Sequence, residues 1–144
     1  GEAIMALPSV GGGYQYTDGN QSEQTIGVQA APQTATATAT LTVAQITGGI
    51  LVGSPSGTAA AYTLPTAALI DATMTNMKVN STFSLVIINL GTTSGLITVT
   101  TSTGLTLVGS VIVGITAGAA GQSGAAEFLF RKTDTAAYSV YRVA

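Results

Sequence analysis

Apolar and polar residues alternate along much of the chain, and this period of two predicts β-strands. The clearest case is TATATATLTV (34–43), in which threonine alternates with alanine, leucine and valine. Because successive side chains of a strand point to opposite faces, this segment should have one threonine face and one more apolar face. GGILVG (48–53) and AAYTL (60–64) follow, separated by the turn-forming residues SPSG, and predict a hairpin of two short strands.

One segment has helical periodicity instead. In PTAALIDATMTNM (65–77), Ile70, Met74 and Met77 recur at i, i+4 and i+7 and form one apolar stripe. Pro65 suits the first position of a helix, where no backbone N–H is needed. We expect this helix to cover an open side of a sheet, with the methionines filling irregular gaps in the packing.

Strand patterns occupy the rest of the chain after this helix. Segments rich in Gly, Ser and Thr separate them, and no proline after Pro65 interrupts a hydrogen-bonded ladder. The predicted strands are 81–90, 96–100, 105–114, 125–132 and 137–143. Short strands at this spacing predict a mainly all-β fold, namely a β-sandwich or jelly-roll-like domain with one short helix.

Residues 1–35 follow neither period. They contain three consecutive glycines and two of the four prolines, and they are too poor in apolar residues to bury a face of their own. We therefore predict an extended N-terminal arm over residues 1–35 and a β domain over residues 36–144, with a disordered leader as the alternative to the arm. Tyr14 and Tyr16 are candidate anchors, because tyrosine combines a large apolar ring with a polar tip.

DGNQSE (18–23), within the arm, partly matches the start of a calcium loop. Asp18 and Asn20 stand at alternate positions, but Glu23 occupies the place of the required glycine and Gln29 that of the bidentate acid. These departures favour a turn held by Asp18 and Asn20 over a metal site. We treat the polar residues Asp18, Asn20 and Glu23 as further candidates for contact with a partner.

Charge is scarce, and this changes the expected surface. Charged residues make up 7% of the sequence, against roughly 25% in a typical soluble domain. A surface so poor in charge should be covered by other copies or by a partner in a permanent assembly.

Four basic residues and a net charge of −2 oppose nucleic-acid binding. The uncharged run 105–126 is too rich in Thr, Ser, Gly and β-branched residues to predict a transmembrane helix.

The sequence contains few residues of the types that carry out catalysis. The absence of histidine and cysteine excludes a Ser-His-Asp triad, a Cys-His pair and metal sites built on either residue. A Ser-Lys pair would need Lys78 or Lys132, and both stand beside predicted turns where a solvated lysine is expected. The acids are scattered, so their spacing neither supports nor excludes a glycosidase pair. GLTLVGS (104–110) has the glycine spacing of a phosphate loop but Ser110 in place of its lysine, and it predicts a strand.

Half of the charged residues stand near the C-terminus, and they are Glu127, Arg131, Lys132, Asp134 and Arg142. FLFRKTDTAAYSVYRV (128–143) predicts a hairpin with Phe128, Phe130 and Lys132 on one face of its first strand and Glu127, Leu129 and Arg131 on the other. The returning strand places Tyr138, Val140 and Arg142 on one side. We expect this hairpin to lie at a solvent-exposed edge of a sheet, where its charges discourage the addition of another strand.

Taken in order, these segments resemble a family of small tailed-bacteriophage head proteins, the decoration or cement proteins. The similarity spans nearly the whole chain and rests on GGYQYTDGNQSE, TATATLTVAQITGGILVG, YTLPTAALIDA, FSLVIINLG, GLTLVGS and FLFRKTDTAAYSVYRV. The resemblance implies a β-rich homotrimer on the outer surface of the virion that binds the major capsid protein and reinforces junctions between capsid subunits. It implies no enzymatic activity and no cofactor.

Composition and resemblance together give three expectations. The homotrimer interface should be lined by the Thr/Ala/Val strands, because so little charge leaves too little polar surface for a monomer. The arm should contact the capsid or a neighbouring copy through Tyr14, Tyr16, Asp18, Asn20 and Glu23. The alternative is a carbohydrate-binding or receptor-binding module of a phage fibre, in which an exposed Tyr138 or Tyr141 would stack on sugar.

Overall fold

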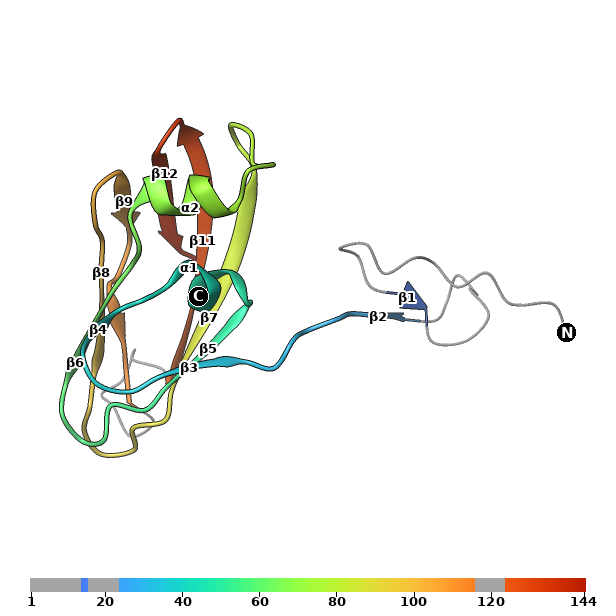
Figure 1. Ribbon diagram of the computed structural model, residues 1–144. Helices are drawn as coiled ribbons and strands as arrows, with labels where there is room; N and C mark the ends of the chain where they lie inside the picture. The colour runs from blue at the N-terminus through green and yellow to red at the C-terminus, as the bar shows by residue number, and fades with distance from the viewer. Residues whose placement is uncertain (1–13, 16–23, 116–123) are drawn as a thin grey trace, which may run out of the picture. The chain divides into compact units, whose positions relative to one another are not determined.

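The computed structural model describes residues 14–15, 24–115 and 124–144, and the chain divides into two units, residues 1–30 and 31–144 (Figure 1). In the first unit, β1 (Tyr14–Gln15) pairs antiparallel with β2 (Thr25–Ile26). The sequence placed the end of the arm at residue 35. However, β3 (Gln33–Ala35) belongs to a sheet of the second unit.

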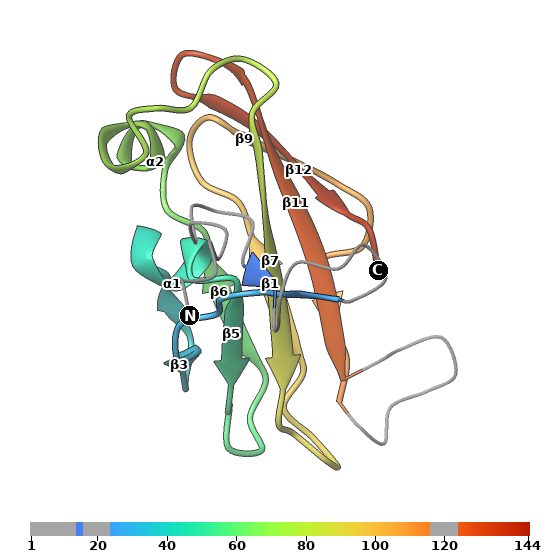
Figure 2. The same ribbon diagram turned by 90° about the vertical axis from the view of Figure 1, so that its right-hand side faces the viewer.

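The second unit is mostly β and contains two sheets (Figures 1 and 2). The six-stranded sheet has the order β3, β5 (Ile50–Gly53), β7 (Thr82–Asn89), β11 (Ala125–Asp134), β12 (Ala137–Arg142) and β9 (Leu105–Val108). The four-stranded sheet has the order β10 (Ile112–Val113), β8 (Ile97–Thr100), β6 (Ala60–Thr63) and β4 (Ala39–Thr40). Antiparallel pairs join β7 to β11, β11 to β12 and β8 to β10, whereas the other neighbours run parallel.

The predicted hairpin of residues 48–53 and 60–64 is wrong. Both strands form, as β5 and β6, but they lie in different sheets, and β5 pairs in parallel with β3 and β7. Alternation shows that each segment has two faces, yet it does not show which other segment lies beside it. The long strand predicted at 105–114 is likewise divided between the two sheets. Gly109 separates β9 from β10 with a φ of 106°, a conformation that side-chain-bearing residues rarely adopt.

The long strand predicted at 34–43 is also interrupted, and its last residue, Val43, is the first residue of a helix that was not predicted. After β3 and β4, helix α1 covers Val43–Thr47. The Thr42 side chain accepts a hydrogen bond from the Gln45 backbone N–H at 3.1 Å, and the Gln45 side chain accepts one from the Thr42 N–H at 2.8 Å. This reciprocal capping box satisfies two N–H groups that a helix start leaves free. Ile46 is fully buried and fixes the short helix to the core.

The second helix confirms the prediction only in part, because it ends at Thr73 and only Ile70 of the predicted stripe belongs to it. Helix α2 covers Ala67–Thr73, with Thr66 as its N-cap, so Pro65 stands just before the cap and not at the first helical position. Ile70 is completely buried, and Met74 and Met77 pack against the core. Among the described residues, no helix has the length and apolar character needed to span a membrane.

One hydrophobic core receives side chains from both sheets and both helices. Phe130 of β11 is fully buried, and its ring stacks on that of Phe83 with the centroids 4.6 Å apart. Asn89 is the only polar residue buried among those that the structure describes. Its Nδ2 donates to the carbonyl oxygens of Gly95 at 2.9 Å and Val113 at 3.2 Å, and its Oδ1 accepts from the Gly91 N–H at 2.8 Å. Asn89 therefore ties β7 of one sheet to β10 of the other.

The C-terminal hairpin is confirmed, but its predicted place at a sheet edge is wrong. β11 and β12 pair antiparallel from Phe128 opposite Arg142 to Asp134 opposite Ala137. β12 then pairs in parallel with β9, and β11 pairs with β7, so both hairpin strands lie inside the sheet. The charges of this region therefore do not serve to protect a free edge.

Candidate association surface

The faces of the two sheets that point away from the core differ in chemistry. On β6 and β8 of the four-stranded sheet, the residues facing away from the core are small or hydroxylic, namely Ala61, Thr63, Thr98 and Thr100, and Ile112 of β10 lies beside them opposite Thr98. The hydroxyl groups of Thr63 and Thr100 lie 3.3 Å apart. Such a face is compatible with water, because each hydroxyl group can both donate and accept hydrogen bonds.

The outer face of the six-stranded sheet is apolar around Val86 and polar around Arg131. Alternation along β5, β7, β11, β12 and β9 directs to it the apolar residues Ile50, Val52, Val86, Ile88, Leu129, Tyr141 and Val108, the hydroxylic residues Thr82, Ser84, Ser139 and Thr106, and the charged residues Glu127 and Arg131. Both helices place their buried residues in the core on the other side of this sheet. Figure 2 shows strands of this sheet side by side, with α1 and α2 to the left of β5 and β7. Within residues 31–115 and 124–144, no element covers this outer face.

Strand register joins these side chains into continuous rows. Ile50 lies opposite Val86, which lies opposite Glu127. In the next row, Ser84 lies opposite Leu129, Leu129 opposite Tyr141, and Tyr141 opposite Val108. Side chains directly opposite on one face lie about 5 Å apart, so each row is a continuous surface. The name outer face is used only for this surface of the six-stranded sheet.

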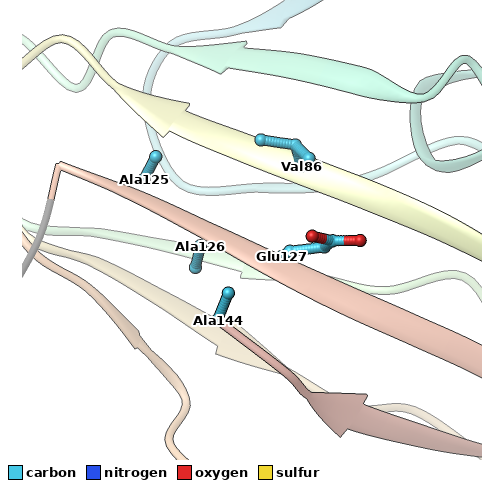
Figure 3. A pocket seen from close by; sticks show the side chains of 5 residues that line it. All are labelled: Val86, Ala125, Ala126, Glu127 and Ala144. Atoms are coloured by element: carbon cyan, nitrogen blue, oxygen red, sulfur yellow. The ribbon is translucent and has the colours of Figure 1, made fainter.

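Glu127 stands in a shallow hollow of the outer face with a volume of about 260 Å³ (Figure 3). The hollow is lined by Val86, Ala125, Ala126, Glu127 and Ala144, so the carboxyl group of Glu127 is its one ionisable side chain. Among the side chains that line the hollow, no nucleophile, metal ligand or second acid stands beside this carboxyl group. The hollow therefore offers apolar area and one acidic side chain to a contacting surface.

Arg131 lies two positions beyond Leu129 and is held by neighbouring side chains. Its Nε donates to the Tyr141 hydroxyl oxygen at 3.0 Å, and its Nη1 donates to Asn80 Oδ1 at 2.7 Å. The hydrogen bond from Arg131 lowers the pKa of Tyr141, because a cationic donor favours the phenolate. The guanidinium also lies 5.8 Å from the centroid of the Tyr141 ring. Tyr141 is thus engaged by Arg131 on the outer face.

The remaining charges of the hairpin bind within the chain. Lys132 was expected to be solvated, but its side chain is only 14% exposed and pairs with Asp71 of α2 at 2.9 Å. Asp71 also accepts from the Tyr138 hydroxyl at 2.7 Å and from the Ala136 N–H at 2.7 Å. The pKa of Asp71 is lowered, chiefly by the hydrogen bond from Tyr138, and burial raises the pKa of Tyr138. At neutral pH an ionised Asp71 and a neutral Tyr138 therefore fasten α2 to the hairpin.

Arg142 links the hairpin to the four-stranded sheet. Its Nη1 donates to the carbonyl oxygen of Ile112 in β10 at 2.6 Å, and its guanidinium lies 5.6 Å from the centroid of the Phe128 ring. Arg142 belongs to the six-stranded sheet and Ile112 to the four-stranded sheet. Together with Lys132, this residue explains why charge gathers in the hairpin: these side chains join it to neighbouring elements.

The predicted partner-binding residues fall mostly outside the part of the chain that the structure describes. Tyr14 lies in β1 opposite Ile26, whereas Tyr16, Asp18, Asn20 and Glu23 are outside the described residues. The partial calcium loop lies there as well. In the described ranges, no three His, Cys, Asp or Glu side chains gather as a metal site.

The fibre alternative loses one of its two candidate tyrosines. Tyr138 is 1% exposed and its hydroxyl group is bonded to Asp71, so its ring cannot stack on a sugar. A second hollow, of about 200 Å³, lies between the loops at 54–57 and 90–94 and is lined by serine, threonine and glycine residues with Leu90. No aromatic ring lines it, so it lacks the stacking surface that the alternative requires.

Comparison with known proteins gives no identity for this arrangement. No protein-family model, no curated protein and no solved structure matches the chain.

Proposed function

We propose that this chain is a structural virion protein that binds the outside of a bacteriophage capsid as a homotrimer and stabilises the assembled shell. Its partners are the major capsid protein and further copies of itself, and it needs no cofactor and catalyses no reaction. The number three and the site on the virion rest on the resemblance of the sequence to phage decoration proteins. We further propose that the two sheets form a β-sandwich, because they share one core, and not a jelly roll, because many neighbouring strands run parallel.

The observation that carries this proposal is the apolar part of the outer face, which no element of residues 31–115 and 124–144 covers. Monomeric soluble proteins rarely expose a continuous apolar patch of several strands, and such patches mark surfaces that bind another protein. A face with one hollow and one acid offers shape and hydrophobic area but no reactive group. Association is therefore the activity that this surface supports best.

Binding to capsids that lack the protein tests the proposal, and a deletion of residues 1–30 tests the arm. Full-length protein should co-sediment with such capsids in a saturable manner. The deletion should leave a folded β unit, because every residue of the core lies within 41–140, yet this variant should lose binding because the arm carries Tyr14 and Tyr16. Circular dichroism of the free variant provides the control for folding.

Two results would contradict these expectations separately. Full occupancy of capsids by the deletion variant would show that the arm is not the contact. Saturable binding of the full-length protein to a cell-surface glycan, with none to capsids, would replace the capsid function with the fibre function.

A further inference from the structure

The outer face carries two opposite charges in an arrangement that fits a second copy of itself. Glu127 and Arg131 lie on the same face of β11, with Leu129 midway between them. Four residues of strand separate them by about 13 Å. We propose that two copies pair through their outer faces about a two-fold axis that crosses β11 at Leu129, so that Glu127 of each copy meets Arg131 of the other.

This inference rests on the proposed association through the outer face and adds to it the partner and the symmetry of the contact. A two-fold contact is separate from the threefold association proposed above. It joins one copy in a trimer to one copy in the next, so trimers that lie side by side on a capsid become linked.

Glu127 requires a cation from whatever surface covers the hollow. Its neighbours there are Val86 and alanines, and a carboxylate enclosed by apolar groups is costly unless a positive charge pairs with it. Lys132 is bound to Asp71, and Arg142 to the carbonyl oxygen of Ile112. Among the outward residues of the described strands, Arg131 is the one basic side chain. A second copy therefore brings the required cation on its own outer face, where Arg131 lies between Thr82 and Ser139.

The relative position of the two charges selects the symmetry. A two-fold axis that lies in the interface and crosses the strands makes the two β11 strands antiparallel, so it exchanges positions 127 and 131 and places Leu129 against Leu129. An axis parallel to the strands would instead bring Glu127 against Glu127, and like charges across an interface cost several kcal/mol. Face-to-face sheets pack about 10 Å apart, a distance that an arginine and a glutamate span together.

Arg131 is already held in position for this contact. Its Nε and Nη1 are fixed by Tyr141 and Asn80, and a guanidinium has five N–H donors in a rigid plane. Donors therefore remain for a carboxylate of the second copy. Because side chains that are already ordered lose less entropy on binding, this support favours the contact.

Charge reversal tests the pairing through the mass of the assembly in sedimentation equilibrium. Glu127→Arg alone and Arg131→Glu alone should each reduce the mass of the wild-type assembly to that of the unit without the pairing, and each should raise the dissociation constant of the pairing on the order of a hundredfold. The double variant Glu127→Arg/Arg131→Glu should regain the wild-type mass. An equal mixture of the two single variants should regain it too, because each interface then contains two opposite-charge pairs.

Controls separate the contact from the fold and from added charge. Thr63→Arg places a charge on the four-stranded sheet, on its side away from the core, and should leave the pairing unchanged. Leu129→Asp sets two carboxylates against each other at the axis and should also reduce the mass to that of the unit without the pairing, so it keeps the test decisive if a reversal variant fails to fold.

Two outcomes would overturn the proposal. Unchanged masses for both single variants would exclude the Glu127–Arg131 contact. Recovery by the double variant without recovery in the mixture would replace the two-fold axis with a cyclic contact. Capsid binding, measured separately on the wild type, reports on the proposed function and not on this pairing.

Discussion

Replacing Phe130 with alanine should lower the free energy of unfolding by about 3–5 kcal/mol, whereas replacing Leu129 beside it should lower it by about 1 kcal/mol. Phe130 is fully buried and stacks on Phe83, so its loss leaves a cavity that the neighbouring strands cannot close. Leu129 points to the outer face, where only neighbouring side chains shield it. Denaturant unfolding at low protein concentration measures both changes in the unassembled chain.

For association between copies, the order of the two effects should be reversed, so that Leu129→Ala has the larger effect. Leu129→Ala removes apolar area at the centre of the proposed contact, so it should weaken association while the chain remains folded. Equal losses of stability for Phe130→Ala and Leu129→Ala would contradict the assignment of one face of β11 to the core and the other to a partner.

Replacing Asn89 with leucine should cost about 2–4 kcal/mol of stability, although leucine has the same branching and the same number of side-chain heavy atoms. The change removes three hydrogen bonds and leaves the carbonyl oxygens of Gly95 and Val113 and the N–H of Gly91 without the partner they have in the native chain. Thermal or denaturant unfolding measures the loss. Thr92→Val provides the matched control. Thr92 is exposed in the loop that follows β7, so this change should be close to neutral.

The Asn89→Asp variant adds a dependence on pH. Its carboxylate can still accept from the Gly91 N–H, but it meets two carbonyl oxygens to which Asn89 donated. Burial and these oxygens raise the pKa of the introduced acid in the folded state, so its neutral form is favoured there. The deficit should therefore be largest at neutral pH and should shrink as the pH falls toward about 4. A deficit that does not vary with pH would contradict the assigned hydrogen bonds.

The elements that the sequence predicts correctly are those with a local signal. The strands that became β7, β8, β11 and β12 follow from alternation between Gly-, Ser- and Thr-rich segments. The periodicity of 65–77 also predicts that a helix is present there, but not that it ends at Thr73, before Met74 and Met77. Helix α1 is too short for its period to be visible, but the spacing of Thr42 and Gln45 was a capping signal that the alternation hid.

The pairing of strands could not be predicted in the same way. β5 and β6 have the alternation and the turn residues of a hairpin, yet β5 finds parallel partners and β6 lies in the other sheet. The same limit applies to the contact between Asp71 and Lys132, because no local pattern links a helix to a strand so far along the chain. Long-range partners are chosen by packing of the whole core.

The candidate surface was predicted only in outline. Scarce charge indicated that some surface must be covered, but it did not show which one. A sharper signal was present: ILV (50–52) and LVII (85–88) are apolar on both faces, and uninterrupted apolar strands are typical of sheets covered on both sides. These strands contribute Ile50, Val52, Val86 and Ile88 to the outer face.

The central claim is that this chain stabilises an assembled capsid, and the temperature at which capsids release their genome tests it most directly. A protein that binds the assembled shell and not its separated subunits adds roughly 2.7 kcal/mol per site at a hundredfold excess over its dissociation constant. Capsids saturated with the protein should therefore retain their genome to a higher temperature than capsids without it. An identical release temperature for the two, at full occupancy, would contradict the proposed function.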